Sequence, residues 1–194
     1  MNLSDVKFYK SVGLRNEEVY FDDKKEIVFV GRSNMGKSSL MNALFQKKDL
    51  VKTSSKPGKT RLANIFLVEN KYIFTDLPGY GFAKLGKELR QELDGLISWY
   101  LEERKSFIKN VVMLVDSKLG PQESDFEMYN FITELEIPVL IVLSKSDKLS
   151  KSELNKSLDF AEKNFFGEEI IAVSVKNKLG IFELEKILKN SLIK

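Results

Sequence analysis

The chain has 194 residues, of which 43% are hydrophobic and 30% are charged, and its formal net charge is +3. This composition is typical of a globular protein and excludes the disordered and fibrous classes. Cysteine and histidine are both absent, which excludes disulfides, thiolate metal sites and histidine-based catalysis. The apolar runs are far shorter than the ~18 residues of a membrane helix, and the first residues do not read as a secretory signal. We therefore expect a cytoplasmic protein without membrane insertion, and we expect a monomer.

Short apolar runs alternate with amphipathic stretches, which predicts an α/β fold with helices on both faces of a mostly parallel sheet. The length suits one domain over residues 1–194, with a core over 26–194 and an N-terminal extension over 1–25 packed on it. Whether the extension forms a strand is left open. Six strands are expected, near residues 26–30, 62–68, 71–76, 110–116, 138–144 and 169–174. The second and third are too close for a parallel crossover and should form an antiparallel hairpin at one edge. Helices are expected near residues 37–46, 87–104, 122–135, 150–164 and 179–192.

The first motif lies between the first predicted strand and the first predicted helix. It reads G-x-x-x-x-G-K-S, the pattern of a loop whose backbone N–H groups hold phosphate at the start of a helix. Lys37 is expected to reach the β- and γ-phosphates of a nucleotide, and the Ser38 hydroxyl to ligate Mg²⁺. The fold should therefore be a three-layer phosphate-loop NTPase domain. The whole motif is predicted to bind the nucleotide: Gly31, Arg32, Ser33, Asn34, Met35, Gly36, Lys37 and Ser38.

A basic segment follows the first predicted helix. Residues 47–61 have a net charge of +5, so the rest of the chain has a net charge of −2. The segment is polar and contains Pro57-Gly58, which predicts a long loop. Thr60 is a candidate second Mg²⁺ ligand, recruited only when a γ-phosphate is present, so that the loop orders with triphosphate and loosens after hydrolysis. Its neighbours are also predicted to bind the nucleotide: Gly58, Lys59, Arg61 and Leu62.

Asp76-Leu77-Pro78-Gly79 forms the second strong motif, at the end of an apolar strand. We expect Asp76 to hold Mg²⁺ through a water and the Gly79 N–H to bond the γ-phosphate, where only a residue without Cβ comes close enough. Leu77 and Pro78 complete this part of the nucleotide site. The expected catalytic residues are Lys37, Thr60 and Gly79, which act on the phosphates directly or, for Thr60, through Mg²⁺.

The third motif, Ser144-Lys145-Ser146-Asp147, follows the most apolar strand. The Asp147 carboxylate could accept hydrogen bonds from N1–H and the N2 amino group of guanine, a donor pair that adenine lacks. The Lys145 stem could lie against the purine, and Ser144 and Ser146 complete this nucleotide-binding loop. The segment Val173-Ser174-Val175 ends the last strand and could support guanine through backbone amides.

In this order the motifs resemble the small GTPase domain across nearly the whole chain. Within the TrmE-Era-EngA-EngB-Septin-like superfamily, the chain is most similar to the EngB family of bacterial GTPases, on the stretches GRSNMGKSSLMNAL, KPGKTR, DLPGYGFAK, Tyr100-Leu101-x-x-Arg104 and GPQESDFEMYNFITELEIPVLIVLSKSDKL. The resemblance implies GTP and GDP as ligands with Mg²⁺. It also implies a role in assembly of the large ribosomal subunit, with ribosomal RNA and proteins as partners, and in cell division and septation.

Two positions depart from the family patterns. Ser144 stands where family members commonly have Thr, which keeps a hydroxyl and so should keep guanine selectivity. Tyr80 stands where the wider superfamily often has a Gln that orients the attacking water. Unassisted hydrolysis is therefore expected to be slow, on the order of 10⁻⁴ to 10⁻² s⁻¹.

The leading hypothesis is a Mg²⁺-dependent GTPase switch whose basic segment 47–61, extended by Lys84, Lys87 and Arg90, contacts ribosomal RNA in the triphosphate state. The alternative for the segment is an ordinary solvated basic surface. Three other functions stay open from the residues alone: an ATP-using phosphotransferase, a nucleotide-gated RNA-binding adaptor with negligible turnover, and a direct role at the division septum.

Overall fold

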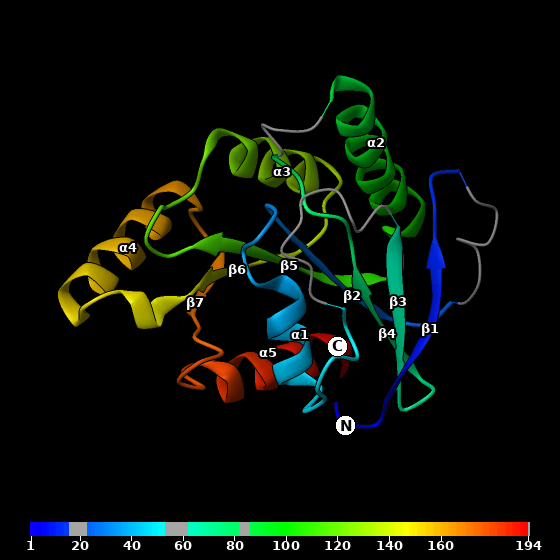
Figure 1. Ribbon diagram of the computed structural model, residues 1–194, viewed down its shortest axis with the longest axis horizontal. Coiled ribbons are helices and arrows are strands. Elements are labelled where there is room, and N and C mark those ends of the chain that lie inside the picture. The colour runs from blue at the N-terminus through cyan, green and yellow to red at the C-terminus, as the bar shows by residue number, and fades with distance from the viewer. Residues whose placement is uncertain (16–22, 53–61, 82–85, 194) are drawn as a thin grey trace.

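A sheet of seven strands lies at the centre of the computed structural model, which describes residues 1–15, 23–52, 62–81 and 86–193 (Figure 1). The strand order is β1-β3-β4-β2-β5-β6-β7. The strands are β1 (Val6–Val12), β2 (Glu26–Gly31), β3 (Ala63–Val68), β4 (Tyr72–Asp76), β5 (Ile108–Asp116), β6 (Val139–Ser144) and β7 (Glu169–Ala172). The helices are α1 (Lys37–Leu44), α2 (Lys87–Arg104), α3 (Glu123–Glu134), α4 (Lys151–Asn164) and α5 (Ile181–Ile193), with a short 3-10 helix η2 (Ser146–Lys148).

The predicted α/β class and the mostly parallel sheet are confirmed. β2 pairs in parallel with β4 and β5, and β6 pairs in parallel with β5 and β7. The predicted hairpin is the antiparallel pair β3 and β4. The predicted number of six strands is wrong, because residues Val6–Val12 form β1 and pair antiparallel with β3. The antiparallel edge is therefore one strand wider than expected.

The added strand β1 satisfies backbone groups that β3 would otherwise expose at an open edge. Phe8 packs against Phe66 of β3 with 5.8 Å between ring centroids. Val12 and Leu3 are buried in the core. The segment 1–15 thus packs on the core through Leu3 and Val12, while a boundary at residue 25 stays a prediction because residues 16–22 lie outside the described part of the chain.

Helices cover both faces of the sheet because successive residues of the central strands point to opposite sides. Val28 and Val30 belong to the apolar core under α2, α3 and α4, whereas Ile27 and Phe29 belong to the core under α1 and α5 (Figure 1). All four side chains are fully buried, and each such burial stabilises the fold by about 1.5–3 kcal/mol. Within the described ranges, none of the helices has the length and apolar character needed to cross a bilayer.

The carboxyl ends of the parallel strands meet at one edge of the sheet. Residues 31–38 follow β2 at this edge, Asp76 ends β4, Asp116 ends β5 and Ser144 ends β6. The strand register brings these residues to the same height along the sheet, because Phe29 pairs with Asp76 and Asp116 pairs with Ser144. In open α/β sheets ligands bind outside this edge, so the fold brings the predicted motifs to one place.

A buried polar cluster ties α2 to β2 and β4 away from that edge. The Arg104 Nε donates to Glu26 Oε2 at 3.0 Å, and the Tyr100 hydroxyl donates to Glu26 Oε1 at 2.7 Å. The Thr75 hydroxyl also donates to Glu26 Oε1, at 2.5 Å. All four residues are fully buried, so the Glu26 charge is compensated by Arg104 and by two hydroxyl donors.

Candidate functional site

The phosphate-binding motif forms a loop between β2 and α1. Asn34 and Gly36 adopt left-handed backbone conformations with φ of 66° and 92°, which turn the chain sharply into α1. Gly36 begins the helix without a side-chain cap, and no acidic residue occupies the first turn. The N–H groups of that turn lack helical partners, so this end of α1 is suited to an anion.

Lys37 joins the loop to the Asp76 motif. Its ammonium donates hydrogen bonds to Asp76 Oδ1 and, at 2.6 Å, to the Leu77 carbonyl oxygen. The Ser38 hydroxyl donates to Asp76 Oδ2 at 3.3 Å. Lys37 and Asp76 are both buried, so their opposite charges compensate each other in a site with little water. A phosphate at the loop would offer Lys37 a second anionic partner.

The donor atoms at this point fit Mg²⁺. This cation prefers oxygen ligands and keeps several of its waters, so it needs few protein ligands beside nucleotide phosphates. Ser38 Oγ and the Asp76 carboxylate supply such oxygens and lie beside each other. Within the described ranges, no three or more acidic, histidine or cysteine residues are grouped so that they could hold a metal ion, so these residues do not form a complete metal cage by themselves.

Gly79 lies against the phosphate-binding loop. A Cβ at this position would be 2.9 Å from Ser33 N and 3.0 Å from Ser33 Cα, closer than a side chain tolerates. The Ser33 N–H also donates to the Tyr80 carbonyl oxygen at 3.2 Å. Only glycine therefore allows this segment to approach the loop so closely.

Tyr80 points its phenol away from solvent and toward α3. The hydroxyl is buried and donates to Asp125 Oδ1 at 2.8 Å. Asp125 Oδ2 accepts from the Gln122 N–H at 2.9 Å, which caps the start of α3. Burial raises the pKa of Tyr80 well above its ordinary value. The phenol has a single proton, which it donates to Asp125. Tyr80 therefore has no proton left to donate to an attacking water.

The predicted guanine motif forms the turn after β6. The Ser144 hydroxyl donates to the Val115 carbonyl oxygen at 3.1 Å, and Lys145 adopts a left-handed conformation with φ of 60°. The Ser146 N–H donates to the Val173 carbonyl oxygen at 3.1 Å. This last bond brings the turn into contact with the segment after β7.

Asp147 and Ser174 meet at this contact. The Ser174 hydroxyl donates to Asp147 Oδ1 at 2.7 Å and accepts from the Asn177 N–H at 3.2 Å. The hydrogen bond from Ser174 lowers the pKa of Asp147 below its ordinary value. Asp147 is partly exposed, so the ionised carboxylate can accept further hydrogen bonds from a ligand. The weak sequence signal at 173–175 thus lies directly beside the stronger one at 144–147.

Asp116 is a site residue that the sequence reading missed. Its Oδ2 accepts from Lys145 Nζ at 2.9 Å, and its Oδ1 accepts from the N–H groups of Lys118 and Leu119. Burial acts to raise its pKa, but the hydrogen bonds from Lys145 and the two N–H groups outweigh it and lower the pKa. The available sequence signal was the position of Asp116 at the end of the predicted strand 110–116.

The predicted loop residues Gly58, Lys59, Thr60 and Arg61 lie outside the described residues, as does Lys84. Leu62 lies within them and is 43% exposed. At the start of the basic segment, Lys47, Lys48 and Lys52 are exposed. Val51, directly before Lys52, is held by Asn42, which accepts from the Val51 N–H at 2.9 Å and donates to the Val51 carbonyl oxygen at 2.8 Å.

The known proteins that resemble this chain are GTPases or GTP-binding proteins. Residues 26–145 match the family model described as "50S ribosome-binding GTPase". The chain is 46% identical over 168 residues to the "Probable GTP-binding protein EngB" of Kosmotoga olearia, covering 85% of this chain and 87% of that protein. The crystal structure of a probable GTP-binding protein EngB superposes with a TM-score of 0.74 at 28% identity, covering 86% of this chain and 98% of that one. Era in complex with MgGDPNP and a segment of 16S ribosomal RNA superposes with a TM-score of 0.70 at 26% identity, covering 94% of this chain and 57% of that one.

Proposed function

Because the chain belongs to the EngB family of GTP-binding proteins, we propose that its GTPase activity serves as a switch in assembly of the large ribosomal subunit. The reaction is hydrolysis of GTP to GDP and phosphate. Membership of a GTPase family does not support the alternative function of an ATP-using phosphotransferase. The observation that carries the ribosomal proposal is the match of residues 26–145 to a family described as ribosome-binding.

In this proposal the nucleotide binds across the carboxyl edge of the sheet. Its phosphates lie on residues 31–38, where Lys37 exchanges part of its contact with Asp76 for the β- and γ-phosphates. Its guanine lies at Asp147, whose carboxylate accepts from the two guanine donors while Ser174 holds one carboxylate oxygen. Adenine would leave that carboxylate without donors, which costs affinity.

We place Mg²⁺ at Ser38, at Asp76 through a water and at Thr60. Support comes from the contact between Ser38 Oγ and the Asp76 carboxylate and from the oxygen preference of the ion. Mg²⁺ bound there would neutralise charge on the phosphates. Removal of Mg²⁺ with EDTA should therefore weaken GTP binding and stop hydrolysis.

Lys37, Gly79 and Thr60 are the proposed catalytic residues. The Lys37 ammonium and the Gly79 N–H would donate to the transferred phosphoryl group and stabilise its charge. We propose slow hydrolysis without a partner, because the Tyr80 phenol donates to Asp125 and no amide side chain occupies that position to orient water. A ribosomal partner would complete the site.

The proposed partner is the large ribosomal subunit or its precursor, bound by a cytoplasmic monomer, and normal cell division and septation depend on the same activity. The exposed Lys47, Lys48 and Lys52 begin the basic segment, and charge of this kind attracts RNA. The structural neighbour Era, which binds a ribosomal RNA segment together with MgGDPNP, supports a GTPase of this fold acting on ribosomal particles.

Co-sedimentation tests the proposal. The purified protein is mixed with large subunits and with precursor particles, in the presence of a non-hydrolysable GTP analogue, GDP or no nucleotide. We expect retention with the GTP analogue that falls steeply with salt and is much weaker with GDP. Equal binding in all three states, or none in any, would overturn the switch.

A further inference from the structure

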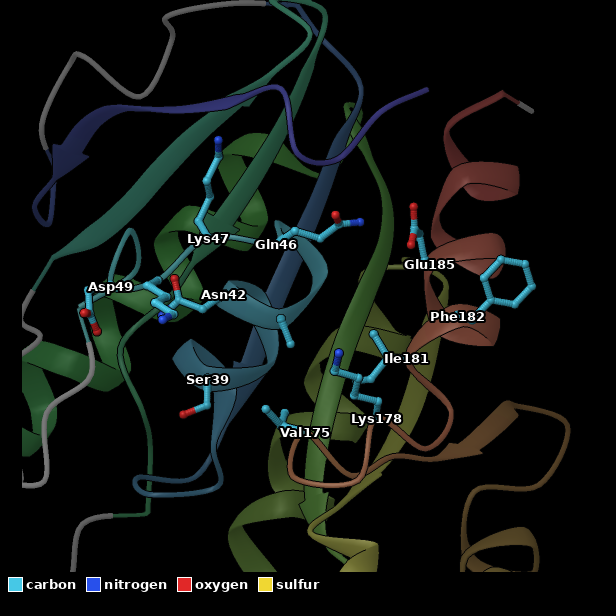
Figure 2. A pocket seen from close by; sticks show the side chains of 12 residues that line it. Ser39, Asn42, Gln46, Lys47, Asp49, Val175, Lys178, Ile181, Phe182 and Glu185 are labelled. Atoms are coloured by element: carbon cyan, nitrogen blue, oxygen red, sulfur yellow. The ribbon is translucent and has the colours of Figure 1, made fainter.

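A groove of about 930 Å³ lies between α1 and α5, beside the nucleotide site (Figure 2). Residues of α1 and the following turn form one wall, and the start of α5 forms the other. Gln46 and Glu185 point toward each other across it, and Lys178 reaches between the two helices (Figure 2). The lining residues used below are Ala43, Lys47, Lys48, Lys178, Ile181 and Phe182.

The charge of the groove is mainly positive. Lys47, Lys48 and Lys178 line it from both sides and are exposed, and within the described part of the chain none of them has a carboxylate partner. The acidic lining residues are Asp49 and Glu185. Glu185 forms an ion pair with Lys189 at 2.6 Å, so its charge is compensated from within α5.

The groove also offers apolar and aromatic surface. Ala43 and Ile181 contribute apolar atoms to its lining. Phe182 lies at the rim on α5 with 76% of its surface exposed, and its ring points outward, away from α1 (Figure 2). An exposed phenyl ring at the edge of a groove that three lysines also line matches the way proteins bind single-stranded nucleic acid, with bases stacked on aromatic rings and phosphates held by cations.

We propose that this groove binds a single-stranded segment of RNA, with a base stacked on Phe182 and phosphates held by Lys47, Lys48 and Lys178. The inference rests on the proposed function, since it assigns a surface for the ribosomal partner. A basic protein segment would be repelled by the same three lysines. RNA carries a negative charge at every nucleotide and has unpaired bases in its loops, so it satisfies both the lysines and the ring.

The groove adjoins both ends of the nucleotide site. Ser39 lines it and directly follows Ser38, and Val175 lines it and directly follows Ser174. Lys47 and Lys48 begin the basic segment 47–61. RNA in the groove would therefore touch the elements that hold the phosphates and the guanine, which gives bound nucleotide a direct route to influence RNA affinity.

Fluorescence anisotropy with a labelled oligouridylate of about 12 nucleotides, within the length range such surfaces bind, tests the proposal on the full chain. Replacing Phe182→Ala should weaken binding about 5- to 150-fold, the equivalent of one lost base stack of ~1–3 kcal/mol. Phe182→Trp should restore it. Replacing Lys47, Lys48 and Lys178 together by Ala should reduce the slope of log affinity against log salt by about 2, because each phosphate contact on a single strand contributes about 0.7.

Matched controls come from the α4 side of the molecule. Phe166 is 90% exposed, so Phe166→Ala removes a ring outside the groove that is even more accessible than Phe182. Lys151, Lys156 and Lys163 of α4 are exposed, and their joint replacement by Ala removes the same charge. The proposal is overturned if Phe182→Ala and Phe166→Ala bind RNA equally well, or if the two lysine triples show the same salt slope. Unchanged melting temperature and GDP affinity of Phe182→Ala establish that the variant is folded.

A photoreactive residue, p-benzoylphenylalanine, in place of Phe182 distinguishes RNA from protein partners on large subunits. A cross-link that ribonuclease removes supports the proposal, and one that only protease removes overturns it. If wild-type protein sediments with large subunits and Phe182→Ala does so equally well, RNA binding by the groove is refuted while the proposed function stands. If wild-type protein does not sediment with them at all, the proposed function fails, and the oligouridylate measurement still decides whether the groove binds RNA.

Discussion

Ser174 donates a hydrogen bond of 2.7 Å to the Asp147 carboxylate from 27 positions further along the chain. This bond joins the turn after β6 to the segment after β7. It also lowers the pKa of Asp147, so the group is ionised and accepts hydrogen bonds at neutral pH. Guanine recognition at Asp147 therefore depends on the geometry of a second segment.

Replacement of Asp147→Ala should weaken GDP binding by about 100-fold or more, because each hydrogen bond to a charged group contributes about 1.5–3 kcal/mol. Ser174→Ala should weaken it by about 3- to 10-fold, since the carboxylate loses its orientation but remains. Titration with a fluorescent GDP analogue measures both. The exposed Glu162→Ala of α4 serves as the control, and a wild-type affinity in Asp147→Ala would refute the assignment.

The Asp116–Lys145 pair should make part of the stability depend on pH. The folded pKa of Asp116 is lowered while the unfolded value is about 3.9. Its stabilising contribution is therefore complete above about pH 4–5 and is lost as the pH falls through the folded pKa. Asp116→Asn should cost about 1–3 kcal/mol of unfolding free energy at pH 7, and this difference should shrink below pH 4. Urea unfolding at several pH values measures it.

The exposed Asp159 of α4 provides the control for the pH series. Asp159→Asn should unfold like the wild type at pH 7 and at lower pH. A loss of stability in Asp116→Asn that stays constant down to pH 3 would show that the ionised carboxylate is not its origin.

Gly79→Ala should push its segment off the phosphate-binding loop, because a Cβ there would be 2.9 Å from Ser33 N. Overpacking of this kind costs about 1–3 kcal/mol of stability. The affinity for a GTP analogue should fall further than that for GDP, since the N–H of residue 79 is proposed to bond only the γ-phosphate. Calorimetric titration with both nucleotides measures the difference. Gly86→Ala is the matched control, because a Cβ at Gly86 meets nothing within 4 Å.

The effects of replacing Glu26 and Arg104 on the free energy of unfolding should be strongly coupled, because the two buried side chains form an ion pair. Arg104→Met alone leaves the Glu26 carboxylate buried without its cation and should cost about 3–5 kcal/mol of unfolding free energy. The double variant Glu26→Gln, Arg104→Met should cost clearly less, because no charge is then stranded. Urea denaturation of the two single variants and the double variant measures the coupling. Additive losses would show that the two side chains act independently.

Motifs with fixed spacing were predictable from the chain because their physical requirements are local. A loop that holds phosphate needs glycines and a following helix, and residues 31–38 contain both. The same applies to Asp76, which ends an apolar strand, and to Asp147, which lies in the turn directly after one. The predicted strands and helices follow from apolar periodicity in the same way.

The features that were missed depend on partners distant in the chain. Strand β1 forms because β3 offers an open edge more than 50 residues later, as the Ser11–Asn64 bond across 53 positions illustrates. Glu26 opens an apolar strand, and its partner Arg104 lies 78 positions away. Asp116 likewise acquires its role only when β5 and β6 align. Sequence periodicity identifies which face is apolar, but it does not identify the partner of a buried charge.

Tyr80→Phe separates a structural from a catalytic role for this residue. The phenol donates to Asp125 at 2.8 Å, and its loss leaves a buried carboxylate oxygen without a donor, at a cost of about 1–3 kcal/mol. Burial already raises the pKa of Asp125, and the hydrogen bond from Tyr80 counteracts that rise. Single-turnover GTP hydrolysis should stay within about twofold of the wild type, because the phenol is committed to α3 and does not orient the attacking water. A large fall in hydrolysis with unchanged urea stability would instead assign the phenol to the reaction.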